Sequence, residues 1–127
     1  MNKIIIITAS ILGALSIVLG AFGAHGLKKV LDPIMLTNFE TGVKYQMYHA
    51  LFLLLVGSLH LIPEQDKKWI YILTLAGVLF FSGSIYLLST KELTGFSISK
   101  FGIITPIGGL MLISAWIVLI FKIISNK

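Results

Sequence analysis

The chain has 127 residues, of which 57% are hydrophobic and only 12% are charged, whereas about 25% of the residues of an average soluble domain are charged. A globule of this size cannot bury so much apolar side chain, because its surface is large relative to its volume. The composition therefore excludes an ordinary soluble domain and predicts a protein whose outer surface contacts the lipid bilayer.

The net charge of +5 comes from lysines that are scattered along the chain. The longest basic runs are Lys28-Lys29 and Lys67-Lys68, and nucleic-acid binding needs a clustered basic patch. We therefore expect no nucleic-acid partner, and a preference of these lysines for anionic lipid headgroups. The chain has no cysteine, which excludes disulfides, thiolate metal sites and thiol catalysis.

Four apolar runs, at residues of about 4–24, 43–62, 69–89 and 101–121, are long enough to cross a membrane. About 20 helical residues span the roughly 30 Å of hydrocarbon at about 1.5 Å per residue. Short connections make successive helices antiparallel neighbours. The sequence thus predicts a single integral membrane domain over residues 1–127. Its fold class is an all-α membrane protein, an antiparallel four-transmembrane-helix bundle, located in the plasma membrane as a multi-pass protein.

The first run resembles a secretory signal peptide, because a lysine precedes an apolar stretch that ends in small residues. The stretch is longer than the usual apolar core of such a signal, and further spans follow, so we expect a retained helix. The second helix is expected to begin before its apolar run, since Asp32 and Pro33 fit an N-cap and a first-turn proline. It should cover residues of about 33 to 62, with Thr37 to Gly42 as an alternative break.

Small residues indicate where the helices pack. In lipid, helices associate through close contacts at small residues and through polar side chains that bond across. Gly13 and Gly20 supply such positions in the first span, Gly83 in the third, and Gly108 and Gly109 in the fourth. We expect these positions to close one bundle, and any remaining seam to serve a homo-oligomer or a membrane protein partner.

Glu40 and Lys44 are four residues apart with the acid first, which is the favourable order for an ion pair on a helix. One interpretation places the pair at the membrane interface, with the Lys44 side chain extending to the headgroups. The other is a functional charge pair inside the membrane. The interfacial interpretation is favoured.

Gln46, His49 and His60 lie on one face of the second helix, within an arc of about 60° to 80° at 3.6 residues per turn. A polar stripe on a membrane helix normally faces the bundle interior. His49 and His60 are about 16 Å apart along the axis, too far to share one metal ion. Antiparallel pairing of the first two spans is expected to bring His25 level with the part of the stripe from Glu40 to His49.

These positions form a candidate polar cluster at the junction of the first two spans: His25, Glu40, Lys44, Tyr45, Gln46 and His49. The leading hypothesis is structural, in a non-enzymatic protein that supports membrane or envelope integrity or a partner complex. The alternative is a gate or ion site of a small transporter, channel or proton-coupled carrier, which uses His25, Glu40 and His49. A minor alternative is haem or metal binding through His25 and His49.

The sequence has no pattern typical of a catalytic or metal site. It contains no HExxH motif, no phosphate-binding loop and no close pair of carboxylates, and the glycine-rich GAFGAHG lacks the preceding strand that dinucleotide binding requires. We therefore expect no catalytic residues, no cofactor and no metal.

Four segments resemble a known family: GAFGAHGLK at 20–28, FETGVKYQMYHAL at 39–51, FSGSIYLL at 81–88 and TPIGGLMLISAW at 105–116. They are similar to small bacterial membrane proteins catalogued as domain of unknown function 423, akin to the small eukaryotic transmembrane protein 256. The resemblance implies a single-domain, four-helix integral membrane protein, but no reaction. The signature positions that it implies are His25, Phe39, Glu40, Thr41, Gly42, Tyr45, Gln46 and His49.

Overall fold

The computed structural model describes residues 1–94 and 101–126 of the chain. Its elements in chain order are α1 (Asn2–His25), η1 (Leu27–Lys29), α2 (Pro33–Ser58), η2 (Glu64–Asp66), α3 (Lys67–Ser89), α4 (Lys91–Thr94) and α5 (Phe101–Ser125). The described chain is helical, as the sequence predicts, and its four long helices cover the four apolar runs except for residues 59–62 at the end of the second run.

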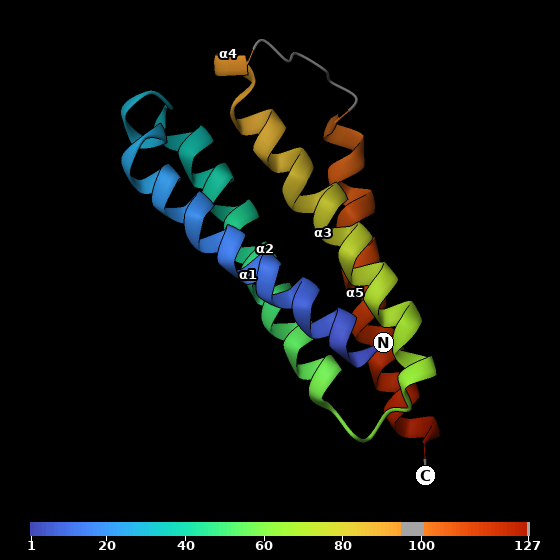
Figure 1. Cartoon of the computed structure of the whole chain (residues 1–127). Coiled ribbons are helices and arrows are strands. Elements are labelled where there is room, and N and C mark those ends of the chain that lie inside the picture. Colours follow the sequence, from blue (N-terminus) through green and yellow to red (C-terminus); the bar gives the residue numbers. More distant parts are fainter. Residues whose placement is uncertain (95–100, 127) are drawn as a thin grey trace.

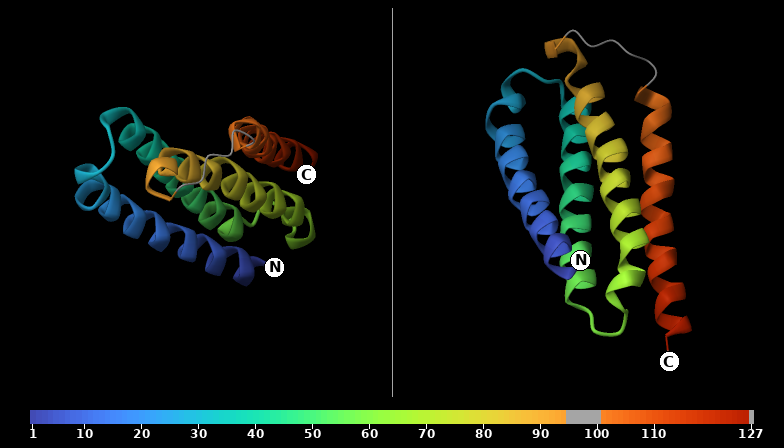
Figure 2. Two further views of the ribbon diagram at one scale, coloured as in Figure 1. Left: turned by 90° about the horizontal axis from the view of Figure 1, so that it is seen from above. Right: turned by 45° about the vertical axis from the view of Figure 1, so that its right-hand side comes forward.

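The four long helices stand in a row in chain order, α1, α2, α3 and α5 (Figure 2, right). The main contacts join α1 to α2, α2 to α3, and α3 to α5. Both chain termini and the connection between α2 and α3 lie at one end of the bundle, which we call the terminal end (Figure 1). The opposite end, with η1 and α4, is called the loop end. Successive long helices are therefore antiparallel.

In the part of the chain that the structure describes, three helical segments are long and apolar enough to cross a membrane: Asn2–Lys29, Glu64–Ser89 and Gly102–Ser125. The remaining long helix, α2, has 26 residues, which corresponds to about 39 Å at about 1.5 Å per residue. Its middle carries polar side chains such as Gln46 and His49, so α2 is long enough to span but less apolar. The fold is a membrane-type helical bundle.

The start of α2 is the one that the sequence predicts. The Met35 backbone N–H donates to Asp32 Oδ1 at 2.9 Å, and Pro33 occupies the first turn. This arrangement satisfies one of the N–H groups that a helix start leaves without an intrahelical partner. The helix then continues without a break through residues 37 to 42.

The end of α2 differs from the prediction. The helix stops at Ser58, because Leu59 adopts an extended conformation with φ −72° and ψ 132°. The Lys67 ammonium, from the start of α3, donates to the Leu59 carbonyl at 2.7 Å. The prediction that the helix reaches residue 62 is therefore wrong. His60 lies in the exposed connection, so its assignment to the inward polar stripe is also wrong.

The backbones of α3 and α5 approach closely at Gly108. A Cβ atom added there would lie 2.3 Å from the Phe81 backbone nitrogen, and one added at Gly77 would lie 2.7 Å from the Leu112 side chain. Gly109 faces the Phe81 ring at 3.6 Å by the same measure. Glycines on both helices therefore make this contact possible, as is common between helices in lipid.

The contact between α1 and α2 is looser. A Cβ atom added at Gly13 would lie 3.8 Å from the Ala50 methyl carbon, and one added at Gly20 would lie 3.5 Å from Val43. These are ordinary van der Waals separations, so the approach of α2 does not require glycine at these two positions. They also define the register in which the first two helices pair.

We expect Gly108→Ala to lower the melting temperature of the purified protein in detergent, because the new methyl group would collide with the α3 backbone. Overpacking of this kind typically costs about 1–3 kcal/mol. The matched control is Gly83→Ala on α3, where an added Cβ meets nothing within 4 Å and alanine favours the helix by roughly 0.5–1 kcal/mol. An equal loss of stability in both variants would contradict the close contact.

Candidate functional site

The predicted polar cluster divides into an interior and an exterior part. Gln46 is 4% exposed and His49 is 5% exposed. His25, Glu40 and Lys44 are exposed on the outside of the bundle. The structure therefore brings only the first two into the interior, and the candidate site is built around them.

The register of α1 and α2 separates His25 from His49. Since Gly13 lies against Ala50, His49 is level with about residue 14 of α1, which is about 17 Å along the axis from His25. Because Gly23 lies against Phe39, His25 is close to the level of Glu40, at one end of the predicted stretch, and its predicted proximity to His49 at the other end is wrong. These two imidazoles are not placed to bind one haem iron or metal ion, and within the described residues no group of three or more metal-ligating side chains occurs.

Glu40 and Lys44 both face outward on α2. Within the described part of the chain no ion pair joins them. The predicted ion pair between Glu40 and Lys44 is therefore not formed, and their charges are not part of the buried network; their position at the membrane interface stays a prediction.

The Gln46 amide connects three helices. Its Nε2 donates to the Leu12 carbonyl of α1 at 2.9 Å, and its Oε1 accepts from the Tyr86 hydroxyl of α3 at 2.6 Å. A second bond between α2 and α3 lies nearby, where Ser82 Oγ donates to the Gly42 carbonyl at 2.7 Å. Because the Leu12 carbonyl can only accept, the orientation of the amide is fixed. Gln46 thus holds α1, α2 and α3 in one arrangement.

His49 connects α2 to α5. The Trp116 indole N–H donates to His49 Nε2 at 3.1 Å. An indole N–H can only donate, so Nε2 must be the unprotonated acceptor and the ring proton must be on Nδ1. Nδ1 in turn donates to the Tyr45 carbonyl at 2.8 Å. The two bonds together select one neutral tautomer of the imidazole.

Aromatic packing encloses this connection. The Phe52 and Trp116 rings lie 4.1 Å apart between centroids, and the His49 ring meets Trp116 edge-on at 6.1 Å. These contacts cover the imidazole side of the hydrogen bond, since His49 is 5% exposed, while Trp116 keeps part of its surface on the outside of the bundle. A hydrogen bond in such a low-dielectric setting is stronger than in water.

The interior network leaves no polar group free for a ligand. Within the described residues, no buried side-chain nitrogen or oxygen lacks a hydrogen-bond partner. A proton or a metal ion could reach His49 Nε2 only if the bond from Trp116 were broken. The arrangement of Gln46 and His49 is therefore suited to holding helices together.

The sequence analysis missed the partners Tyr86 and Trp116. Both lie in segments that carry the family resemblance, FSGSIYLL and TPIGGLMLISAW. The signal was the presence of a hydrogen-bonding aromatic side chain deep in an otherwise apolar span, where such a group needs a partner. No pattern in the sequence indicates which residue that partner is.

A second hydrogen-bond network, which was not predicted from the sequence either, joins the elements at the terminal end. Lys67 is fully buried and donates to Asn2 Oδ1 at 2.9 Å as well as to the Leu59 carbonyl. Glu64 accepts from the Asn2 backbone N–H at 3.0 Å and pairs with the Met1 amino group at 3.3 Å. These bonds connect the start of α1 to the connection between α2 and α3.

We expect Trp116→Phe to lower the free energy of unfolding in detergent, because it removes the donor and leaves His49 Nε2 without a partner. Interhelical hydrogen bonds in membranes contribute roughly 0.6 to 1.7 kcal/mol. His49→Leu removes the other side of the same bond. If the two residues act together, the double variant loses less stability than the sum of the single variants; purely additive losses would argue against a direct bond.

Comparison with known proteins identifies relatives along nearly the whole chain. A family model described as protein of unknown function (DUF423) matches residues 19–109. UPF0382 membrane protein SH2409 of Staphylococcus haemolyticus is 40% identical and covers 94% of each chain. UPF0382 membrane protein YwdK of Bacillus subtilis is also 40% identical and covers 93% of this chain and 94% of its own.

A fungal relative is UPF0382 membrane protein C1782.12c of Schizosaccharomyces pombe, which is 41% identical over 85% of this chain and 91% of its own. No solved structure matches the chain. The relatives' names and the apolar helices agree that this is a multi-pass membrane protein that lies in a lipid bilayer. The family resemblance of the four segments is confirmed: the chain belongs to the DUF423 family of UPF0382 membrane proteins, with bacterial and fungal members.

Proposed function

We propose that the chain is a non-enzymatic, four-span membrane protein with a structural role, which supports the integrity of the membrane either alone or in a complex. The observation that carries this proposal is the interior network. Gln46 and His49 use their polar atoms to bond α1, α3 and α5 to α2. Polar groups that are used in this way rigidify a fold and are not left over for a substrate.

The position of α2 supports a fourth span. It contacts α1 on one side and α3 on the other, and both neighbours are apolar enough to cross the bilayer. The side chains that lower its hydropathy include Gln46 and His49, which neighbouring helices cover. A polar residue that is covered by protein costs much less in a membrane than one exposed to lipid.

The outer surface supports a role within the bilayer. In the most apolar stretch of each helix, only a minor share is buried inside the chain: 17% in α1, 33% in α3 and 22% in α5. The remaining apolar surface is available to lipid or to other membrane proteins. In the part of the chain that the structure describes, the buried core consists of side chains packed between the helices.

The carrier hypothesis needs His25, Glu40 and His49 to act as one cluster. His25 and Glu40 are exposed, and both nitrogens of His49 have bonding partners. This separation supports the structural role over the transporter, channel or proton-coupled carrier.

Four spans can be tested by labelling, because the natural chain contains no cysteine. We expect Gln65→Cys and Asn126→Cys to react with a membrane-impermeant maleimide from one side of the membrane. Lys29→Cys and Leu93→Cys should react from the other side, since they lie at the loop end. Labelling of Lys29→Cys and Gln65→Cys from the same side would show that α2 does not cross.

The structural role can be tested in a strain that lacks the gene. We expect such a strain to take up propidium iodide, and the double variant His49→Leu/Trp116→Phe to restore the barrier, because replacing both partners of a buried bond by apolar groups is nearly neutral. Folded protein is measured in the same cells by size exclusion in mild detergent.

The surface variant Glu40→Gln is the matched control, and it should restore the barrier fully. A double variant that folds but does not restore the barrier would show that the imidazole itself is needed, and would reject the structural role. A deletion strain with an intact barrier would reject the role in membrane integrity.

A further inference from the structure

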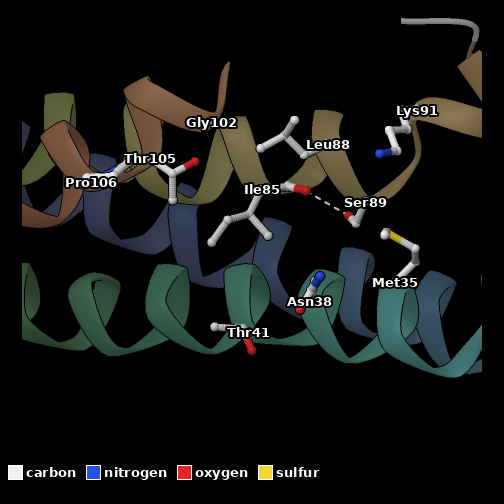
Figure 3. Close-up of a pocket in the computed structure, with 10 residues that line it drawn as sticks. All are labelled: Met35, Asn38, Thr41, Ile85, Leu88, Ser89, Lys91, Gly102, Thr105 and Pro106. Carbon is white, nitrogen blue, oxygen red and sulfur yellow. Dashed lines mark hydrogen bonds between the residues drawn. The ribbon is translucent and has the colours of Figure 1, made fainter. Parts of the chain in front are cut away.

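A cavity of about 350 Å³ opens between α2, α3 and α5 near the loop end. In Figure 3, Asn38 on α2 and Ile85 on α3 line the cavity from facing helices, and Lys91, the first residue of α4, extends toward the same space. Leu88 and Pro106 complete the apolar walls. The cavity is thus apolar inside and polar at its rim, which is a common design of ligand sites.

A second hollow of similar volume, about 350 Å³, lies between the same three helices. Its lining includes Phe81 of α3 and Trp116 of α5. On α2 the residues that line the two hollows are Asn38, Thr41, Tyr45 and His49. Their spacing of three or four positions keeps them on one helix face. The two hollows therefore follow one another along a single line, with α3 beneath it.

The row of two hollows is closed at the end near Trp116. Trp116 packs on Phe52 with ring centroids 4.1 Å apart, so α5 meets α2 there and the hollow stops. From Gly102 to Trp116 the lining of α5 extends about 21 Å at about 1.5 Å per residue. With about 350 Å³ in each hollow, the resulting groove has the length and the volume for an extended hydrocarbon chain.

Within the bilayer such a groove is not filled by water, because its apolar walls offer no hydrogen bonds. A void would leave the lining atoms without van der Waals partners. The surrounding lipid supplies acyl chains, which fill narrow apolar spaces without needing polar partners. An acyl chain is therefore the occupant that the groove fits.

The polar residues at the rim of the cavity favour a negatively charged ligand. Among the described residues that line the cavity, Lys91 is the one with a charged side chain, and none is acidic. Within the described residues, neither Lys91 nor the Asn38 amide has a hydrogen-bond or ion-pair partner. Both are donors, and a lipid phosphate is a strong acceptor. We propose that the groove binds one acyl chain of an anionic glycerophospholipid, with its headgroup phosphate at Lys91 and Asn38.

This inference does not depend on the structural role of Gln46 and His49, and it is tested separately. The chain has two tryptophans, so Trp69→Phe leaves Trp116, at the closed end of the groove, as the fluorescent reporter. The protein is placed in nanodiscs of phosphatidylcholine that contain increasing fractions of phosphatidylglycerol with mid-chain bromine, which quenches tryptophan on contact. The comparison series contains phosphatidylcholine with the same brominated chains.

We expect brominated phosphatidylglycerol to quench Trp116 at about a fivefold lower mole fraction than brominated phosphatidylcholine, the factor that one lysine near an anionic lipid provides. Lys91→Gln should remove this preference. Lys28→Gln is the matched control, a loop-end lysine that is exposed and does not line the groove, and it should keep the preference. Asn38→Ala, at a second rim position, should reduce the preference.

Equal quenching by the two lipids would overturn the proposal, because it would indicate ordinary lipid around the bundle. An equal loss of preference in Lys28→Gln and Lys91→Gln would also overturn it, since general surface charge would then explain the effect. If Lys91→Gln does not yield folded protein, Asn38→Ala and Lys28→Gln give the same comparison. None of these outcomes alters the test of the structural role, which measures a different property in cells.

Discussion

The bundle depends on a few hydrogen bonds from polar side chains of α2 to its neighbours. In lipid the helix faces are no more apolar than their surroundings, so burial of apolar surface does not select one arrangement. Gln46 and His49 do, because both polar atoms of the Gln46 amide and Nε2 of His49 each have a partner at a fixed position on another helix. The less apolar helix is therefore the one around which the others are arranged, and its polar residues belong to the fold.

Much of this architecture was predictable from the sequence. The apolar runs predict the helices, since length and composition are what the membrane selects. The start of α2 at Pro33 follows from local capping chemistry at Asp32. The inward direction of Gln46 and His49 follows from helical periodicity, because polar groups in a membrane helix turn toward protein.

The remaining features depend on tertiary contacts. His60 was assigned to the polar stripe on the assumption that α2 continues to residue 62. The helix ends at Ser58 instead, where Lys67 of α3 donates to the Leu59 carbonyl. This bond joins two different elements and is therefore not visible in the local sequence. The position of His25 depends on the register of two helices, which close packing near Gly13 determines. The partners of His49 and Gln46 come from α5 and α3, and no local pattern connects residues so far apart in the chain.

The row of helices in chain order has a consequence for biogenesis. Each long helix packs mainly against the one made just before it, so the fold can assemble as successive hairpins while the ribosome is still translating. The bonds from Trp116 to His49 and from Lys67 to Asn2 are different, because they join positions 67 and 65 apart. During synthesis His49 Nε2 therefore has no bond from Trp116 until α5 has been translated and inserted. A chain truncated before α5 would therefore leave this nitrogen without its partner.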